Sequence, residues 1–212
     1  MTGPKLSVIG RNIRKTIALT VLLPGMFLAN AAVAQEPVDL ELVLAADGSG
    51  SIDDAELALQ RQGYANAVRN PKVLDLLTGG IHGRSVIAYV EWGNALSQHT
   101  IVDWTVIDGP ESAAAFGEAL VNAPREAWGF NSISNAIAYS QRLIDQNPYR
   151  GLRRIIDISA DAGNIGGMPL RAAPPVRLAR IAVLARLLHR LVGGVVDGVL
   201  DALDGVLDRS LG

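Results

Sequence analysis

Residues 45–57 read AADGSGSIDDAEL, and this stretch decides which fold the rest of the chain can form. Counted from Ala45, its spacing resembles the calcium loop of an EF-hand. The oxygen-bearing side chains at the ligand positions belong to Asp47, Ser49, Ser51, Asp53 and Glu56. The first ligand position, however, is Ala45, and the residues before it alternate as a strand does rather than a helix. The spacing of an EF-hand is therefore coincidental in this interpretation.

The residues on either side of the turn at 47–51 predict a strand before it and a helix after it. Residues 38–46 alternate apolar with polar side chains and then become continuously apolar, as a strand entering a core does. Asp53 and Glu56 suit a helix N-terminus, through capping and through the helix dipole. Open α/β sheets bind ligands at the carboxyl ends of strands. The turn therefore predicts an oxygen-rich site, suited to a hard cation such as Mg²⁺.

The later segments continue an α/β order. Strands at 85–92 and 99–107 are joined by a short polar turn, which predicts an antiparallel hairpin. Helices at 110–122 and 132–147 precede a β-branched strand at 151–161, typical of a buried parallel strand. This order predicts a doubly wound α/β fold with a mainly parallel sheet and an antiparallel edge hairpin.

The D-G-S-G-S turn resembles the D-x-S-x-S signature of von Willebrand factor A domains, the metal-ion-dependent adhesion site. Residues 37–165 are especially similar to an exported bacterial group of such proteins of unknown function. The similar motifs are VDLELVLAADGSGSID, QRQGYA, HGR, YVEW and RRIIDIS. The resemblance implies a divalent cation, Mg²⁺ first with Mn²⁺ or Ca²⁺ as alternatives. The residues it implies around the cation are Asp47, Ser49, Ser51, Asn131, Ser132 and Asp161.

Some of these positions depart from the family pattern or have a simpler interpretation. Asn131 stands where the family has a threonine, and the adjacent Ser132 could substitute for it. Both residues are also favoured helix caps. The turn at 47–51 could be a plain turn in which Asp47 caps the next helix. Asp161 alone could be a turn residue at the end of a strand.

The first 34 residues have the features of a secretory signal peptide. A basic start precedes an interrupted apolar run that is too short to span a bilayer, and small residues before Gln35 suit cleavage after Ala34. We therefore expect a periplasmic or secreted protein with no stable membrane span. The formal net charge of −2 gives no reason to expect nucleic acid as a partner, and the chain has no cysteine for a disulfide or a thiolate zinc site.

The composition changes near residue 168. Residues 35–167 are predicted to form a partial von Willebrand A-like domain, and residues 168–212 a divergent tail of amphipathic helices. One such helix would carry Leu178, Ile181 and Leu188 on its apolar face. No strand is predicted after Asp161, so the domain would be incomplete at its C-terminus and its strand at 151–161 would form an unpaired apolar edge. A frameshift or gene fusion would explain the tail.

Three functions remain after these observations. The first is a metal-dependent binding module, without catalysis, whose cation bridges to a protein or an acidic ligand. The second is a degenerate fragment without activity. The third is a hydrolase, which has little support because no nucleophile-elbow motif occurs and because His82, His99 and His189 are scattered in the sequence.

Overall fold

A computed structural model describes residues 1, 35–160, 163–172 and 179–183. The chain divides into two units, Met1–Ala32 and Val33–Gly212. Of the first unit only Met1 is described, so the fold given below is that of the second unit. The predicted signal peptide, Asp161 and most of the predicted tail lie outside the described residues. No helix in the described ranges is long and apolar enough to cross a membrane.

The described strands form one sheet in the order β3-β2-β1-β4-β5. β1 lies at its centre and pairs in parallel with β2 and β4, whereas β2 and β3 are antiparallel. The strands are β1 (Glu36–Asp47), β2 (Ser85–Trp92), β3 (Gln98–Ile107), β4 (Tyr149–Ala160) and β5 (Ala179–Val183). The predicted mainly parallel sheet with an antiparallel edge hairpin is therefore confirmed.

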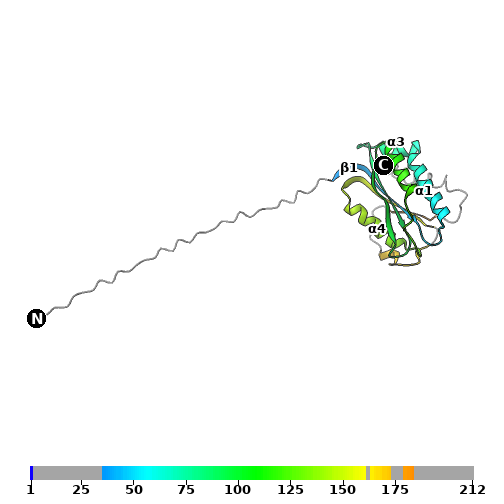
Figure 1. The fold of residues 1–212 in the computed structure, drawn as a ribbon. Coiled ribbons are helices and arrows are strands. Elements are labelled where there is room, and N and C mark those ends of the chain that lie inside the picture. The colour runs from blue at the N-terminus through cyan, green and yellow to red at the C-terminus, as the bar shows by residue number, and fades with distance from the viewer. Residues whose placement is uncertain (2–34, 161–162, 173–178, 184–212) are drawn as a thin grey trace. The chain divides into compact units, whose positions relative to one another are not determined.

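Helices cover both faces of the sheet (Figure 1). Alternate residues of β1 supply the two cores: Leu42 and Leu44 pack with α1, α2 and α3, while Val43 and Ala45 pack with α4. The helices are α1 (Asp54–Arg69), α2 (Pro71–Thr78), α3 (Pro110–Asn122) and α4 (Ile133–Gln146), with a 3₁₀ turn at Leu170–Ala172. Layers of helix on both faces are the expected packing of a parallel sheet.

The start of α1 confirms its prediction. The Asp53 carboxylate accepts a hydrogen bond from the Glu56 N–H at 2.8 Å, and the Glu56 carboxylate accepts one from the Asp53 N–H at 2.9 Å. This reciprocal pair is a capping box, which satisfies two backbone donors at the first turn. At the other end, α1 ends at Arg69 and Pro71 begins α2, a helix that the sequence interpretation missed. The Asn70 side chain caps α2 by accepting from the Lys72 N–H.

One prediction is wrong at the C-terminal side of the sheet. A strand does follow Asp161: β5 pairs in parallel with β4, from Ile156 opposite Ala179 to Ala160 opposite Val183. This strand lies within the segment that was predicted to be an amphipathic helix through Ile181. Short apolar runs are ambiguous between the two periodicities, and here the open edge of β4 provides hydrogen-bond partners that favour the strand. The apolar end of β4 is therefore paired, not exposed.

Candidate metal centre

Asp47 is the last residue of the central strand and the buried carboxylate of the candidate site. It is only 1% exposed and lies opposite Trp92 of β2. One carboxylate oxygen, Oδ1, accepts a hydrogen bond from the Ser49 N–H at 2.8 Å, which closes the turn that follows the strand. Asp47 does not cap α1, since Asp53 does. Asp47 therefore stabilises the turn that follows β1 and not the N-terminus of α1.

Asn131 joins Asp47 from the loop between α3 and α4. Its Nδ2 donates to Asp47 Oδ2 at 2.9 Å, although 84 residues separate the two in the chain. The orientation of the amide is set by chemistry, because a carboxylate only accepts hydrogen bonds and must face the NH₂ group. Asn131 is 4% exposed and does not cap α4, whose N-cap is Ser132. The structure therefore brings the first two predicted loops together.

Ser49 and Ser51 place their hydroxyl oxygens 3.1 Å apart. Neighbouring ligands of an octahedral Mg²⁺, with bonds of about 2.1 Å, lie about 3.0 Å apart. The same geometry around Ca²⁺, with bonds of about 2.4 Å, needs about 3.4 Å. Ser49 is fully buried whereas Ser51 is exposed, so this pair spans from the interior to the surface. At this distance the two hydroxyls hydrogen-bond to each other, and the same spacing is compatible with adjacent ligands of a divalent cation.

Ser132 differs from the residues above. Its N–H donates to the Gly93 carbonyl at 2.8 Å. Its hydroxyl oxygen lies 2.9 Å from Asn135 Oδ1 and 3.0 Å from the Gly166 carbonyl. The hydroxyl thus joins the first turn of α4 to the residues after β4. Asp161, the sixth predicted residue, lies outside the described ranges.

Arg125 holds the D-G-S-G-S loop through its backbone, and the sequence interpretation did not identify it. Its Nη2 donates to the carbonyl oxygens of Gly48 and Ser49, both at 3.1 Å, and of Ile52 at 2.8 Å. Nη1 pairs with the exposed Asp54 carboxylate at 2.9 Å. The guanidinium also lies 4.3 Å from the centre of the Trp128 ring, a cation–π distance. One side chain therefore connects the first loop to the second.

Glycine backbones make this close approach between the loops. The Gly50 N–H donates to the Gly129 carbonyl at 2.8 Å, and Gly129 has a φ of +94°, which favours glycine. A Cβ on Gly93 would lie 2.2 Å from the Trp128 carbonyl oxygen, which is shorter than any normal contact. Glycine is therefore needed at Gly93, where a Cβ would clash with the second loop, and is favoured at Gly129 by its positive φ.

A buried ion pair connects the end of β2 to the start of the second loop. Glu91, near the end of β2, is fully buried and accepts from Arg61 Nε at 2.7 Å and from Nη2 at 3.0 Å. Arg61 also donates to the carbonyls of Ala123 and Pro124, where the second loop begins. Burial disfavours the charged guanidinium, but the hydrogen bond and charge of Glu91 outweigh it and raise the pKa of Arg61. Glu91 is thus a structural carboxylate.

Aside from Asp47, the acidic residues contribute little to the centre in the part of the chain that the structure describes. No group of three or more His, Asp or Glu side chains gathers there to hold a metal. The candidate donors are therefore one carboxylate, two hydroxyls and one amide. Mg²⁺ accepts such a set, because it keeps several waters and needs few protein ligands. Asp47, Ser51 and Asn131 also have further interactions beyond those described above.

This fold, with a D-x-S-x-S loop at the carboxyl end of its central strand, is that of a von Willebrand A-like domain, as the resemblance implied. The chain belongs to a family of proteins of unknown function, DUF1194, whose model matches residues 37–186. β5 lies within the matched range. No curated protein matches the sequence significantly.

Several solved structures are similar at low identity. The von Willebrand factor type A protein from Catenulispora acidiphila is 16% identical over 78% of this chain and 43% of its own, with a TM-score of 0.49. The pilus adhesin SpaC from Lactobacillus rhamnosus GG is 12% identical over 61% and 16%, with a TM-score of 0.44. Proximal thread matrix protein 1 from the mussel byssus, with a zinc-occupied MIDAS motif, is 16% identical over 60% and 30%, with a TM-score of 0.42. The match spans less than half of each neighbour's chain.

Proposed function

We propose that the protein is an exported binding module that holds a divalent cation, Mg²⁺ first, at its D-x-S-x-S loop. Asp47, Ser49 and Ser51 would provide the first loop of the site and Asn131 the second. The observation that carries the proposal is the meeting of a buried carboxylate, two hydroxyls and an amide at the carboxyl end of the central strand. Carboxylate, hydroxyl and amide oxygens are the kinds of ligand that Mg²⁺ accepts in proteins.

The surroundings of the loop support a protein as the partner. Large apolar side chains are exposed on three loops at this end of the sheet: Leu96 (95%), Phe130 (76%), Ile165 (67%) and Trp128 (55%). Backbone hydrogen bonds join these loops, from Asn94 N to Trp128 O at 3.1 Å and from Ile165 N to Asn131 O at 2.9 Å. Exposed apolar groups that cluster beside a polar centre are typical of protein-binding surfaces. An acidic group of the partner would complete the coordination of the cation.

The hydrolase alternative has one supporting geometry and two opposing ones. Ser97 Oγ lies 3.2 Å from His99 Nε2, and His99 Nδ1 lies 3.4 Å from Glu126 Oε2, in the order of a catalytic relay. However, Ser97 Oγ also accepts the Trp128 N–H at 3.0 Å, so this oxygen positions the second loop. Ser97 and His99 line neither the cavity beside α2 nor the smaller one beside Arg125. The relay is better explained as loop support, and we propose no catalysis.

The test is thermal denaturation of the purified protein with and without Mg²⁺, Mn²⁺ or Ca²⁺. A ligand that binds only the folded state stabilises it by about 2.7 kcal/mol when present at about 100 times its dissociation constant. We expect this stabilisation in the unaltered protein and its loss in Ser49→Ala, which removes one hydroxyl ligand. The matched control is Ser140→Ala, which removes a buried hydroxyl from the middle of α4 and leaves the loop intact.

The results of these melts distinguish a metal-binding module from a fragment without activity. Metal stabilisation that Ser49→Ala abolishes and Ser140→Ala retains supports the binding module. No stabilisation of the unaltered protein by any of the three metals would favour a fragment without activity. Stabilisation that persists in Ser49→Ala would place the metal elsewhere and remove the D-x-S-x-S loop from the proposal. Export is tested separately, by sequencing the N-terminus of the protein recovered outside the cytoplasm, where we expect Gln35.

A further inference from the structure

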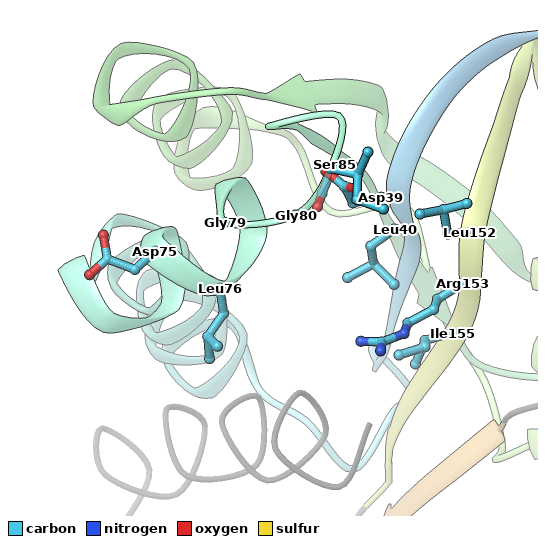
Figure 2. A pocket seen from close by; sticks show the side chains of 11 residues that line it. Asp39, Leu40, Asp75, Leu76, Gly79, Gly80, Ser85, Leu152, Arg153 and Ile155 are labelled. Atoms are coloured by element: carbon cyan, nitrogen blue, oxygen red, sulfur yellow. The ribbon is translucent and has the colours of Figure 1, made fainter. Parts of the chain in front are cut away.

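A cavity of about 420 Å³ lies at the opposite end of the sheet from the candidate metal centre (Figure 2). It is open to solvent on one side and is lined by α2, by the loop that follows α2, and by residues in the first halves of β1 and β4. Its volume is within the range of about 300–1,000 Å³ that is typical of small-molecule sites. Most of its wall is apolar, from Leu40, Leu76, Ile81, Leu152 and Ile155. The cavity therefore suits the apolar body of a small molecule.

Arg153 places a positive charge on this apolar wall. It lies opposite Leu40 in the parallel register of β4 and β1, so the two side chains share one face of the sheet. The neighbouring Arg154 lies on the other face, where its Nε pairs with Glu41 at 3.2 Å. Arg153 is partly buried, and its side chain makes no hydrogen bond or ion pair with the described residues. Its guanidinium stays charged and presents a planar set of donors that matches a carboxylate.

Neither of the two carboxylates in the cavity wall forms an ion pair with the Arg153 guanidinium. Asp39 accepts the His82 N–H at 3.0 and 3.1 Å and the Arg84 N–H at 3.2 Å, so both of its oxygens hold the loop after α2 in place. Figure 2 shows the Asp75 carboxylate on α2, pointing away from the side chain of Arg153. Arg153 is therefore the charged group that extends from the sheet toward the cavity.

We propose that this cavity binds a small amphipathic monocarboxylate, a molecule with a flexible apolar chain and one carboxylate. The chain lies against Leu40, Leu76 and Ile155, and the carboxylate pairs with the Arg153 guanidinium. Among the described residues that line the cavity, Arg153 is the one cation, whereas Asp39 is held by backbone donors and Asp75 points away, so the selection for an anion rests on the guanidinium. This site is independent of the metal centre, since it shares no residue with it and requires no cation.

The experiment uses octanoate as the probe, with octanol and octylamine as comparisons, in buffer without divalent metal. Binding is measured by isothermal titration calorimetry on the purified protein. We expect octanoate to bind more tightly than octanol and octylamine. We expect Arg153→Gln to weaken octanoate binding about tenfold to a hundredfold, the factor that charged hydrogen bonds contribute. Arg150→Gln is the matched control, because it removes an exposed arginine from the same strand, outside the cavity.

A second variant tests the cavity itself. Leu76→Trp fills the space beside α2 without removing the guanidinium, so it should abolish octanoate binding, and a thermal melt without ligand shows that the variant is folded. The proposal is overturned if the unaltered protein does not bind octanoate at millimolar concentration. It is also overturned if octanol binds equally well, or if Arg153→Gln and Arg150→Gln have the same effect. None of these results depends on whether the protein binds a metal.

Discussion

Replacing Glu91 by Gln tests the buried ion pair that supports the candidate centre. The Glu91 side chain is fully buried, and its partner Arg61 is 6% exposed. Two hydrogen bonds join them, at 2.7 and 3.0 Å. Glutamine has nearly the same shape but offers one acceptor oxygen in place of two, and its NH₂ group would face a donor. The Arg61 guanidinium would therefore stay buried without its counter-charge and with one acceptor fewer, although its bonds to the Ala123 and Pro124 carbonyls remain.

The expected cost follows from this burial. Removing one member of a buried ion pair costs about 3–5 kcal/mol, because the remaining charge loses its counter-charge and cannot reach water. The exposed pair of Arg84 and Glu36 is the matched control, since the two side chains are 32% and 46% exposed. An exposed pair is worth about 0–1 kcal/mol, so Glu36→Gln should change the stability little. The two substitutions are chemically identical and differ only in burial.

Urea denaturation followed by circular dichroism measures both costs. The double variant Arg61→Met/Glu91→Gln should be less destabilised than the sum of its single variants, by about 0.5–3 kcal/mol, because it removes both charges. A cost of Glu91→Gln below about 1 kcal/mol, equal to that of Glu36→Gln, would refute the reasoning. It would show that water or a local rearrangement compensates the guanidinium.

Two further predictions concern the second loop and the core. Gly93→Ala would press a Cβ onto the Trp128 carbonyl, so we expect a loss of about 1–3 kcal/mol in urea denaturation, weaker metal stabilisation, and a shift in tryptophan fluorescence. Gly109→Ala, which has open space around it, should show none of these effects. Burial raises the pKa of both Tyr64 and Tyr89, so the unfolded state loses its tyrosine protons first as pH rises above about 10. The free energy of unfolding should then fall by up to about 1.4 kcal/mol per pH unit for each tyrosine. Phenylalanine at either position should make this fall shallower, and an unchanged slope would contradict the assignment.

The periodic features of the sequence predicted most of the fold. The alternation of residues 38–46 located β1, and the capping residues Asp53 and Glu56 located the start of α1. Both signals are local, because the side chains that decide them lie within one strand or one turn. The pairing of β2 with β3 was also predictable, since the short turn between them leaves little choice but a hairpin.

The missed features depend on contacts between distant segments. Arg125 donates hydrogen bonds to backbone carbonyl oxygens. Because every residue has a carbonyl oxygen, the sequence does not reveal which residues Arg125 contacts. β5 forms because the edge of β4 is open to it, a condition that its own short apolar run does not reveal. Asn131 could be anticipated from the family resemblance, but its contact with Asp47 appears only in three dimensions.

The partial cover of β4 by β5 bears on how copies of the protein behave toward one another. The recorded pairing with β5 begins at Ile156, so the earlier half of β4 has no such neighbour among the described residues. That half carries three arginines, at positions 150, 153 and 154. An open strand edge is a template for a second chain, and repulsion between like charges is a common protection against it. These arginines would therefore keep the protein from polymerising through its sheet at high concentration.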